Sequence, residues 1–149
     1  MRDPAVTPER KHPRDLLDAW VIDHLVSRAA RRGHDRNMAL RLIDVTLVYL
    51  VACGENPGAK LSPPSDDADE IWHDLITCTK AYARICEKVA GRFIHHRPIV
   101  NDDITSGRSH TRTIAAMRRT GLPIDEELLV EAPTCMNTCN HACSDADSD

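Results

Sequence analysis

Apolar residues recur at intervals of three and four along most of this chain, and no stretch alternates apolar and polar positions over any length. Intervals of three and four place side chains on one face of an α-helix, whereas strict alternation is typical of a half-buried strand. The pattern therefore predicts an all-α protein. We expect a small bundle of three main helices with one or two short helices.

The first helix is predicted to begin at Pro13, because proline has no N–H to satisfy at the first helical position, and to end near Gly33. Its apolar face is expected to carry Leu17, Trp20 and either His24 or Leu25. The second helix is predicted from an N-cap at Asp35 to about Cys53, with Gly54 just beyond its end. Its wide apolar surface predicts a central position in the bundle.

The third helix is predicted as one long element that begins near Ser65 or Asp66 and ends at Gly91. One continuous apolar stripe supports it, formed by Ile71, Leu75, Cys78, Tyr82, Ile85 and Val89. Phe93 and Ile94 are expected to anchor the segment that follows. A short fourth helix is predicted over 109–120, and one more turn over 123–131.

Length and composition predict one helical domain with a tail at each end. The chain has 149 residues, divided here into a loose arm at 1–12, a helical domain at 13–131 and a disordered, acidic, cysteine-containing tail at 132–149. Aromatic residues are only 3% of the chain, so Leu, Ile, Val and Ala must fill most of the core.

Charge and hydropathy argue against two classes of partner. The net charge of -4 argues against a general nucleic-acid binder, which is usually basic. No uninterrupted apolar run approaches the ~18 residues of a membrane span, and the first residues lack the basic-then-apolar order of a signal peptide. We therefore expect a cytoplasmic protein with reduced thiols, in which six cysteines point to metal binding, redox chemistry or modification.

The stretch from 64 to 98 carries an unusual order of residue types. It reads P-S-x3-D-E-x-W-H, then Y-x3-C, then G-R-F-x-H-H-x-P; the residues concerned are Pro64, Ser65, Asp69, Glu70, Trp72, His73, Tyr82, Cys86, Gly91, Arg92, Phe93, His95, His96 and Pro98. This order resembles the glycine-rich domain-containing protein-like family. The resemblance implies a helical module more than an activity. The long glycine-rich region of the larger members is absent, which implies a small stand-alone version.

Two metal-binding groups can be built from this stretch. Asp69 precedes His73 by four residues, so the carboxylate and the imidazole share a helix face. With a histidine from the returning segment or from a partner subunit, they would form a two-histidine, one-carboxylate set suited to non-haem iron or, with water, to zinc. The other group is Cys86 with His95 or His96. In a third interpretation, Trp72, Phe93 and the histidines only pack and hydrogen-bond to hold the helix end.

Distance favours the group that contains Cys86. If the helix is continuous, His73 lies ~27 Å from Gly91 along the axis, and the return to His95 covers at most ~14 Å. A site joining His73 to His95 within one chain is therefore strained unless the helix ends early.

The tail offers a second set of donors. Cys135, Cys139 and Cys143 are spaced by four residues, and His141 lies between the last two. Three thiolates and one imidazole could hold zinc or Cu(I). The same cysteines could instead be substrates of a modifying enzyme that recognises the helical domain.

The leading hypothesis is a small cytoplasmic helical protein that binds a transition metal through His73, Cys86, His95 and His96, with Asp69 in support. Zinc is favoured, with iron or copper as alternatives. The other hypotheses are a carrier or precursor modified at its tail cysteines by a partner enzyme, a small metalloenzyme with a histidine–carboxylate site, and a structural interaction module. No catalytic signature decides whether the protein is an enzyme, and the oligomeric state stays open.

Overall fold

A computed structural model describes residues 12–97 and 107–129 of the chain. These residues form five α-helices and two short 3-10 turns, with no β-strand among them, which confirms the all-α prediction. In chain order the elements are η1 (Pro13–Leu16), α1 (Ala19–Arg31), α2 (Arg36–Glu55), α3 (Asp66–Thr77), α4 (Thr79–Ala90), α6 (Arg108–Arg119) and η2 (Glu126–Leu129). The predicted arm up to residue 11 and the tail lie outside the described residues.

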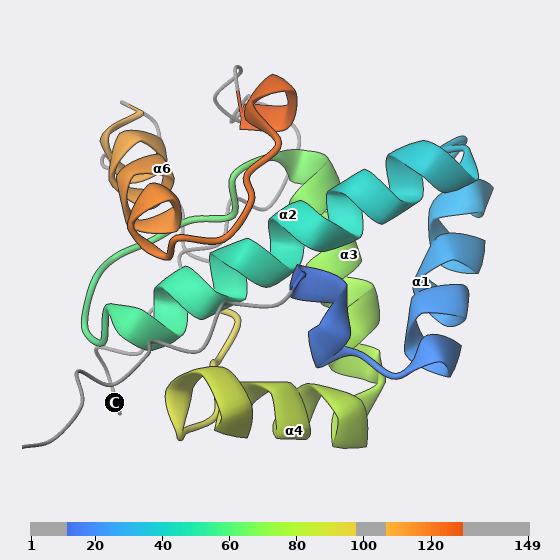
Figure 1. The fold of residues 1–149 in the computed structure, drawn as a ribbon, viewed down its shortest axis with the longest axis horizontal. Helices are drawn as coiled ribbons and strands as arrows, with labels where there is room; N and C mark the ends of the chain where they lie inside the picture. Colours follow the sequence, from blue (N-terminus) through green and yellow to red (C-terminus); the bar gives the residue numbers. More distant parts are fainter. Residues whose placement is uncertain (1–11, 98–106, 130–149) are drawn as a thin grey trace, which may run out of the picture.

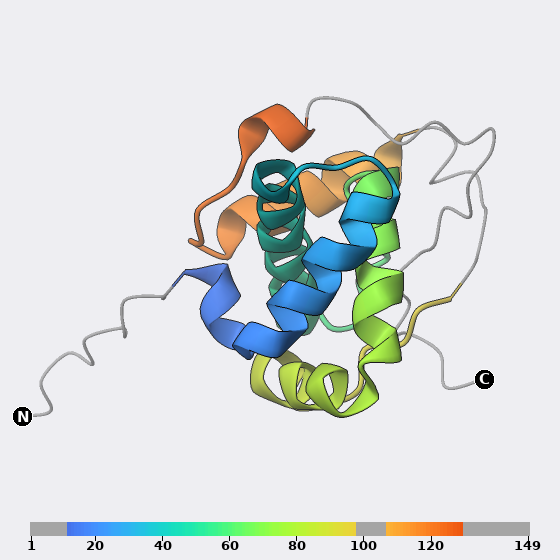
Figure 2. The ribbon, with the colours of Figure 1, turned by 90° about the vertical axis from the view of Figure 1, so that its right-hand side faces the viewer.

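Helix α2 is the centre of the fold. It contacts α1, α3, α4, α6 and η1, which surround it in Figures 1 and 2. Every residue from 45 to 53 is buried, so this part of the helix is apolar on all sides. Among the described helices, α2 is also the one long and apolar enough to cross a membrane, but 67% of that window is buried inside the fold, as in the core helix of a globular protein.

The predicted caps of the second and third helices are confirmed. The Asp35 carboxylate accepts a hydrogen bond from the backbone N–H of Met38 at 2.8 Å, and the Ser65 hydroxyl accepts one from Ala68 at 3.1 Å. Each bond satisfies an N–H group that has no partner within its helix. Gly91 closes α4 in the left-handed conformation, with φ of 66°.

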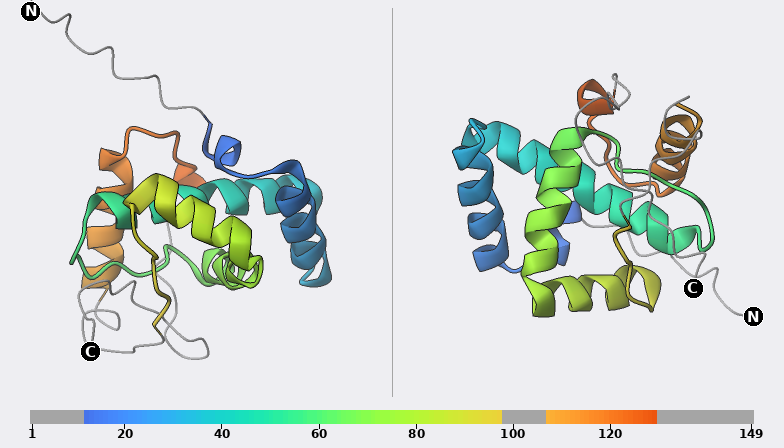
Figure 3. Two further views of the ribbon diagram at one scale, coloured as in Figure 1. Left: turned by 90° about the horizontal axis from the view of Figure 1, so that it is seen from below. Right: turned by 180° about the vertical axis from the view of Figure 1, so that it is seen from behind.

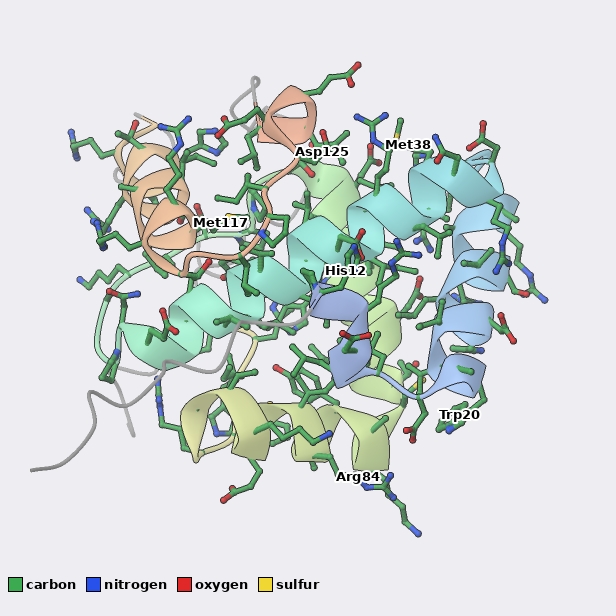
Figure 4. All side chains as sticks on the ribbon, viewed as in Figure 1. His12, Trp20, Met38, Arg84, Met117 and Asp125 are labelled. Carbon is green, nitrogen blue, oxygen red and sulfur yellow. The ribbon has the colours of Figure 1, made fainter. Side chains whose placement is uncertain are left out.

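The predicted start of the first helix is wrong. Pro13 begins η1, and the chain is extended at Leu17 and Asp18 before α1 begins at Ala19. The later start changes the buried face, which consists of Val21, Leu25 and Ala29. Trp20, expected in the core, is 58% exposed and points away from the body in Figure 4.

The predicted long third helix is also wrong, because it is divided at Cys78. Figures 1 and 3 show α4 leaving the end of α3 in a clearly different direction. The Thr77 hydroxyl donates to the carbonyl of Asp74 at 2.6 Å, and the N–H of Cys78 donates to Leu75 instead, at 3.0 Å. The threonine side chain therefore takes the carbonyl that the next helical N–H would need, which ends α3.

Gly54 and Phe93 lie in environments that differ from those predicted. Gly54, predicted just beyond the second helix, lies inside α2, where it crosses α4. An added Cβ at Gly54 would lie 2.2 Å from the carbonyl oxygen of Val89, so only glycine permits this close approach. Ile94 is fully buried as expected, but Phe93 is 46% exposed.

Candidate metal centre

Three side chains that could hold a metal ion meet where the segment after α4 returns to α3. They are Asp69 and His73, one turn apart on α3, and His96. One donor atom from each residue lies within 4.8 Å of the other two. Residues 27 positions apart are thus brought to one place by the change of direction at Cys78.

The distances within this cluster are close to those of a bound metal. His96 Nε2 lies 2.9 Å from Asp69 Oδ1, and His73 Nε2 lies 3.5 Å from Asp69 Oδ2. Tetrahedral zinc with bonds of about 2.0–2.2 Å separates its donor atoms by ~3.3–3.5 Å. The Asp69 carboxylate faces both imidazoles, with one of its oxygens near each of them.

The cluster is buried on one side and open on the other. The side chains of Asp69 and His96 are only 10% and 9% exposed, whereas that of His73 is 48% exposed. A carboxylate this buried requires hydrogen bonds or a cation to offset its lost hydration. The exposed edge at His73 gives water or another small ligand access to the same point.

Trp72 forms the buried wall of the cluster. Its ring stacks on His96 with centroids 4.1 Å apart and planes 26° from parallel, and Tyr49 meets its edge at 5.3 Å. Trp72 is fully buried, and its indole N–H donates to the Tyr82 hydroxyl at 3.0 Å. The orientation of the His96 ring is therefore set by a side chain that cannot itself move freely.

The other proposed donors of the helical domain lie elsewhere. Cys86 is buried in α4, where its sulfur accepts the backbone N–H of Ile94 at 3.4 Å. His95 is exposed, with its ring 4.9 Å from Phe93. Neither belongs to the group of three that the structure brings together. The tail donors Cys135, Cys139, His141 and Cys143 lie outside the described residues.

The distance argument against joining His73 to the returning segment does not apply, because the helix ends early. It assumed one helix from Ser65 to Gly91, whereas α3 ends at Thr77. The sequence signal for the break was the Thr77-Cys78-Thr79 triplet, since threonines can bond to their own helix backbone. Sequence reasoning also missed the bond between Trp72 and Tyr82, which supports His96 from behind.

The fold and cluster define a small all-helical protein with a histidine–carboxylate site at its surface. Residues 23–120 match the model of the UCP032817-like family, and the chain belongs to that uncharacterised family. The resemblance to the glycine-rich domain-containing protein-like family is therefore wrong; it rested on scattered residues within 64–98, whereas this match spans most of the helical domain. No curated protein and no solved structure matches the chain.

Proposed function

We propose that this protein binds a transition-metal ion, with zinc favoured, through Asp69, His73 and His96. The observation that carries the proposal is the convergence of their donor atoms within 4.8 Å. These residues come from two separate segments, so their meeting is a product of the fold and not of sequence proximity. Of the donors predicted in the helical domain, the proposal keeps these three. It leaves out His95 and Cys86, which lie outside the group.

The donor set suits a metal with an open coordination position. Two neutral imidazoles and one carboxylate are ligands that zinc accepts, and the fourth position is then left for water. The same set on one face of an octahedral ion is typical of non-haem iron, and imidazole also binds copper. No sulfur lies in the group of three, which makes Cu(I) the least suitable ion for this site.

Packing alone would also explain some of these contacts. In that alternative, the Asp69 carboxylate accepts hydrogen bonds from the two imidazoles and joins α3 to the returning segment. His73 separates the two interpretations, because its imidazole is half exposed and its 3.5 Å contact with Asp69 is long for a hydrogen bond. Such a contact contributes little stability, whereas a metal ligand at the same place would be essential for binding.

A small metalloenzyme is the second candidate, favoured by the exposed edge at His73. A zinc-bound water at an open position can act as a nucleophile near neutral pH. The cytoplasmic location, a protein partner, and the carrier role of the tail cysteines remain predictions, as does a second thiolate site there. The structural-module hypothesis becomes the preferred one if no metal binds.

The test is the metal content of anaerobically purified protein, measured by elemental mass spectrometry. We expect about one ion per chain in the full-length protein and in a truncation after Ala132. We expect less bound metal per chain in His73→Gln and His96→Gln, because loss of a ligand should weaken affinity at least roughly tenfold when even residues that only support ligands change it 10–100-fold. His95→Gln is the matched control, since His95 is the adjacent histidine outside the cluster.

Besides the absence of bound metal, two results would contradict the proposal. Unchanged metal content in both cluster variants would show that the ion lies elsewhere. Metal in the full-length protein but not in the truncation would place it on the tail, at Cys135, Cys139, His141 and Cys143.

A further inference from the structure

Two side chains of α4 hydrogen-bond to the backbone of Ile94, one to its carbonyl and the other to its N–H. The Tyr82 hydroxyl donates a hydrogen bond to its carbonyl, and the Cys86 sulfur accepts its N–H at 3.4 Å. Tyr82 and Cys86 are four residues apart on α4, so they project from the same face, and each is only 1% exposed. The returning segment is thus docked on α4 through its backbone at one residue.

The same tyrosine also supports the ring that lies under His96. Its hydroxyl accepts the indole N–H of Trp72 at 3.0 Å while it donates to Ile94. Trp72 in turn stacks on His96 at 4.1 Å. One hydroxyl therefore joins the backbone two residues before His96 to the aromatic surface against which its imidazole rests.

We propose that Tyr82 and Cys86 are positioning residues for His96 as a metal ligand, an inference that rests on the proposed function. Neither side chain binds the ion; they fix the segment so that the imidazole already faces Asp69. Without them, the ordering of the segment has to occur during binding and weakens affinity. Cys86 then acts as the acceptor for the N–H of Ile94, and not as the metal ligand that the sequence predicted.

The first test measures zinc affinity by competition with a chromophoric chelator. Tyr82→Phe removes only the hydroxyl, and we expect it to weaken affinity by about 10–100-fold, as removal of supporting groups does at other metal sites. Cys86→Ala should weaken affinity as well. Cys86→Ser should restore part of it, because the serine hydroxyl can again accept the N–H of Ile94.

A matched control separates positioning from general loss of stability. Thr113 is fully buried in α6, donates to the carbonyl of Ser109 at 2.9 Å and accepts the N–H of Ser62 at 3.0 Å. Thr113→Val loses these bonds and should destabilise the fold, but its zinc affinity at a temperature where it is folded should equal that of the wild type. Equal weakening in Thr113→Val and Tyr82→Phe would overturn the inference.

The Co(II) spectrum provides a test for Cys86 itself. A thiolate ligand gives a near-ultraviolet charge-transfer band, so a positioning cysteine predicts a Co(II) spectrum without that band. A band that is present in the wild type and lost in Cys86→Ser would make Cys86 a ligand and overturn its positioning role.

A measurement without metal distinguishes the failure of this inference from the failure of the proposed function. The His96 side chain is only 9% exposed, so diethyl pyrocarbonate should modify it slowly in the wild type and faster in Tyr82→Phe and Cys86→Ala. The exposed His95 is the internal reference and should react equally in all forms. Faster modification of His96 in a protein that binds no metal would refute the metal function and leave the positioning of His96 established. Wild-type affinity and wild-type His96 reactivity in both variants would refute the positioning role.

Discussion

The crossing of α2 and α4 at Gly54 allows a sharp test of the packing that places the candidate metal centre. A Cβ at Gly54 would lie 2.2 Å from the Val89 oxygen, 2.7 Å from the Val89 carbonyl carbon and 3.2 Å from the Ala90 Cα. All three are backbone atoms, so no side-chain rotation can relieve the contact. Gly54→Ala should therefore force the two helices apart and destabilise the fold.

The magnitude follows from two opposing effects. Overpacking costs about 1–3 kcal/mol, and a rigid backbone partner favours the upper end of that range. Replacing glycine by alanine inside a helix returns about 0.5–1 kcal/mol. The net loss is then about 2 kcal/mol, which corresponds to a decrease in Tm of roughly 6–10 °C for a domain of this size.

The crossing also bears on the site. Arg92, two residues after the end of α4, donates to the carbonyls of Cys53 at 3.2 Å and Gly54 at 3.5 Å. If α4 moves away, these bonds weaken at the start of the segment that carries His96. Gly54→Ala should therefore lower metal affinity as well as Tm.

Thermal unfolding followed by circular dichroism is the assay. Ser27→Ala is the control, because Ser27 is exposed in the middle of α1 and alanine there should leave Tm unchanged or slightly higher. A Gly54→Ala protein with a Tm equal to or above that of the wild type would refute the close crossing, since only the gain in helix propensity would then remain.

Three further predictions concern single side chains. Hydrogen bonds from Arg41 lower the pKa of Asp125, so Asp125→Asn should destabilise the protein at pH 7, and the difference in urea unfolding should disappear as pH falls through the folded-state pKa. Burial lowers the pKa of His110, although a hydrogen bond to the backbone of Leu129 opposes the shift. As the pH falls, the unfolded chain therefore binds a proton at this histidine before the folded protein does. The wild type should lose stability below about pH 6.5, and His110→Gln should lose less. Trp20→Ala should lower the free energy of unfolding in the same assay by clearly less than the about 3–5 kcal/mol that replacing a buried tryptophan costs, because the side chain is 58% exposed.

Local patterns predicted the helical class and several helix ends. Asp35 and Ser65 cap their helices because a short polar side chain can reach the free N–H groups within the first turn. Gly91 ends α4 because it adopts positive φ without strain. Such features depend on neighbouring residues only, so the sequence contains the whole argument.

The spacing of apolar residues predicted the wrong helix boundaries where two successive elements share one apolar stripe. The apolar stripe from Ile71 to Val89 continues across Cys78 although the helix does not, because both α3 and α4 bury that side against α2. Similarly, Trp20 fits a helical repeat that begins at Pro13, but the extended residues before Ala19 interrupt the repeat. A pattern records which residues are buried, not whether the helix between them is continuous.

For the candidate site, the sequence determined that Asp69 and His73 share a helix face, because four-residue spacing fixes that geometry in any α-helix. Only the tertiary structure decided that His96 joins them while Cys86 and His95 do not. That choice depends on the turn at Cys78, on the close crossing at Gly54, and on the bonds that hold Ile94 against α4. The crossing and the Ile94 bonds are contacts between different elements, and neither follows from residue spacing. The turn at Cys78 has a local signal in the flanking threonines, but only the tertiary structure shows where the turned chain leads.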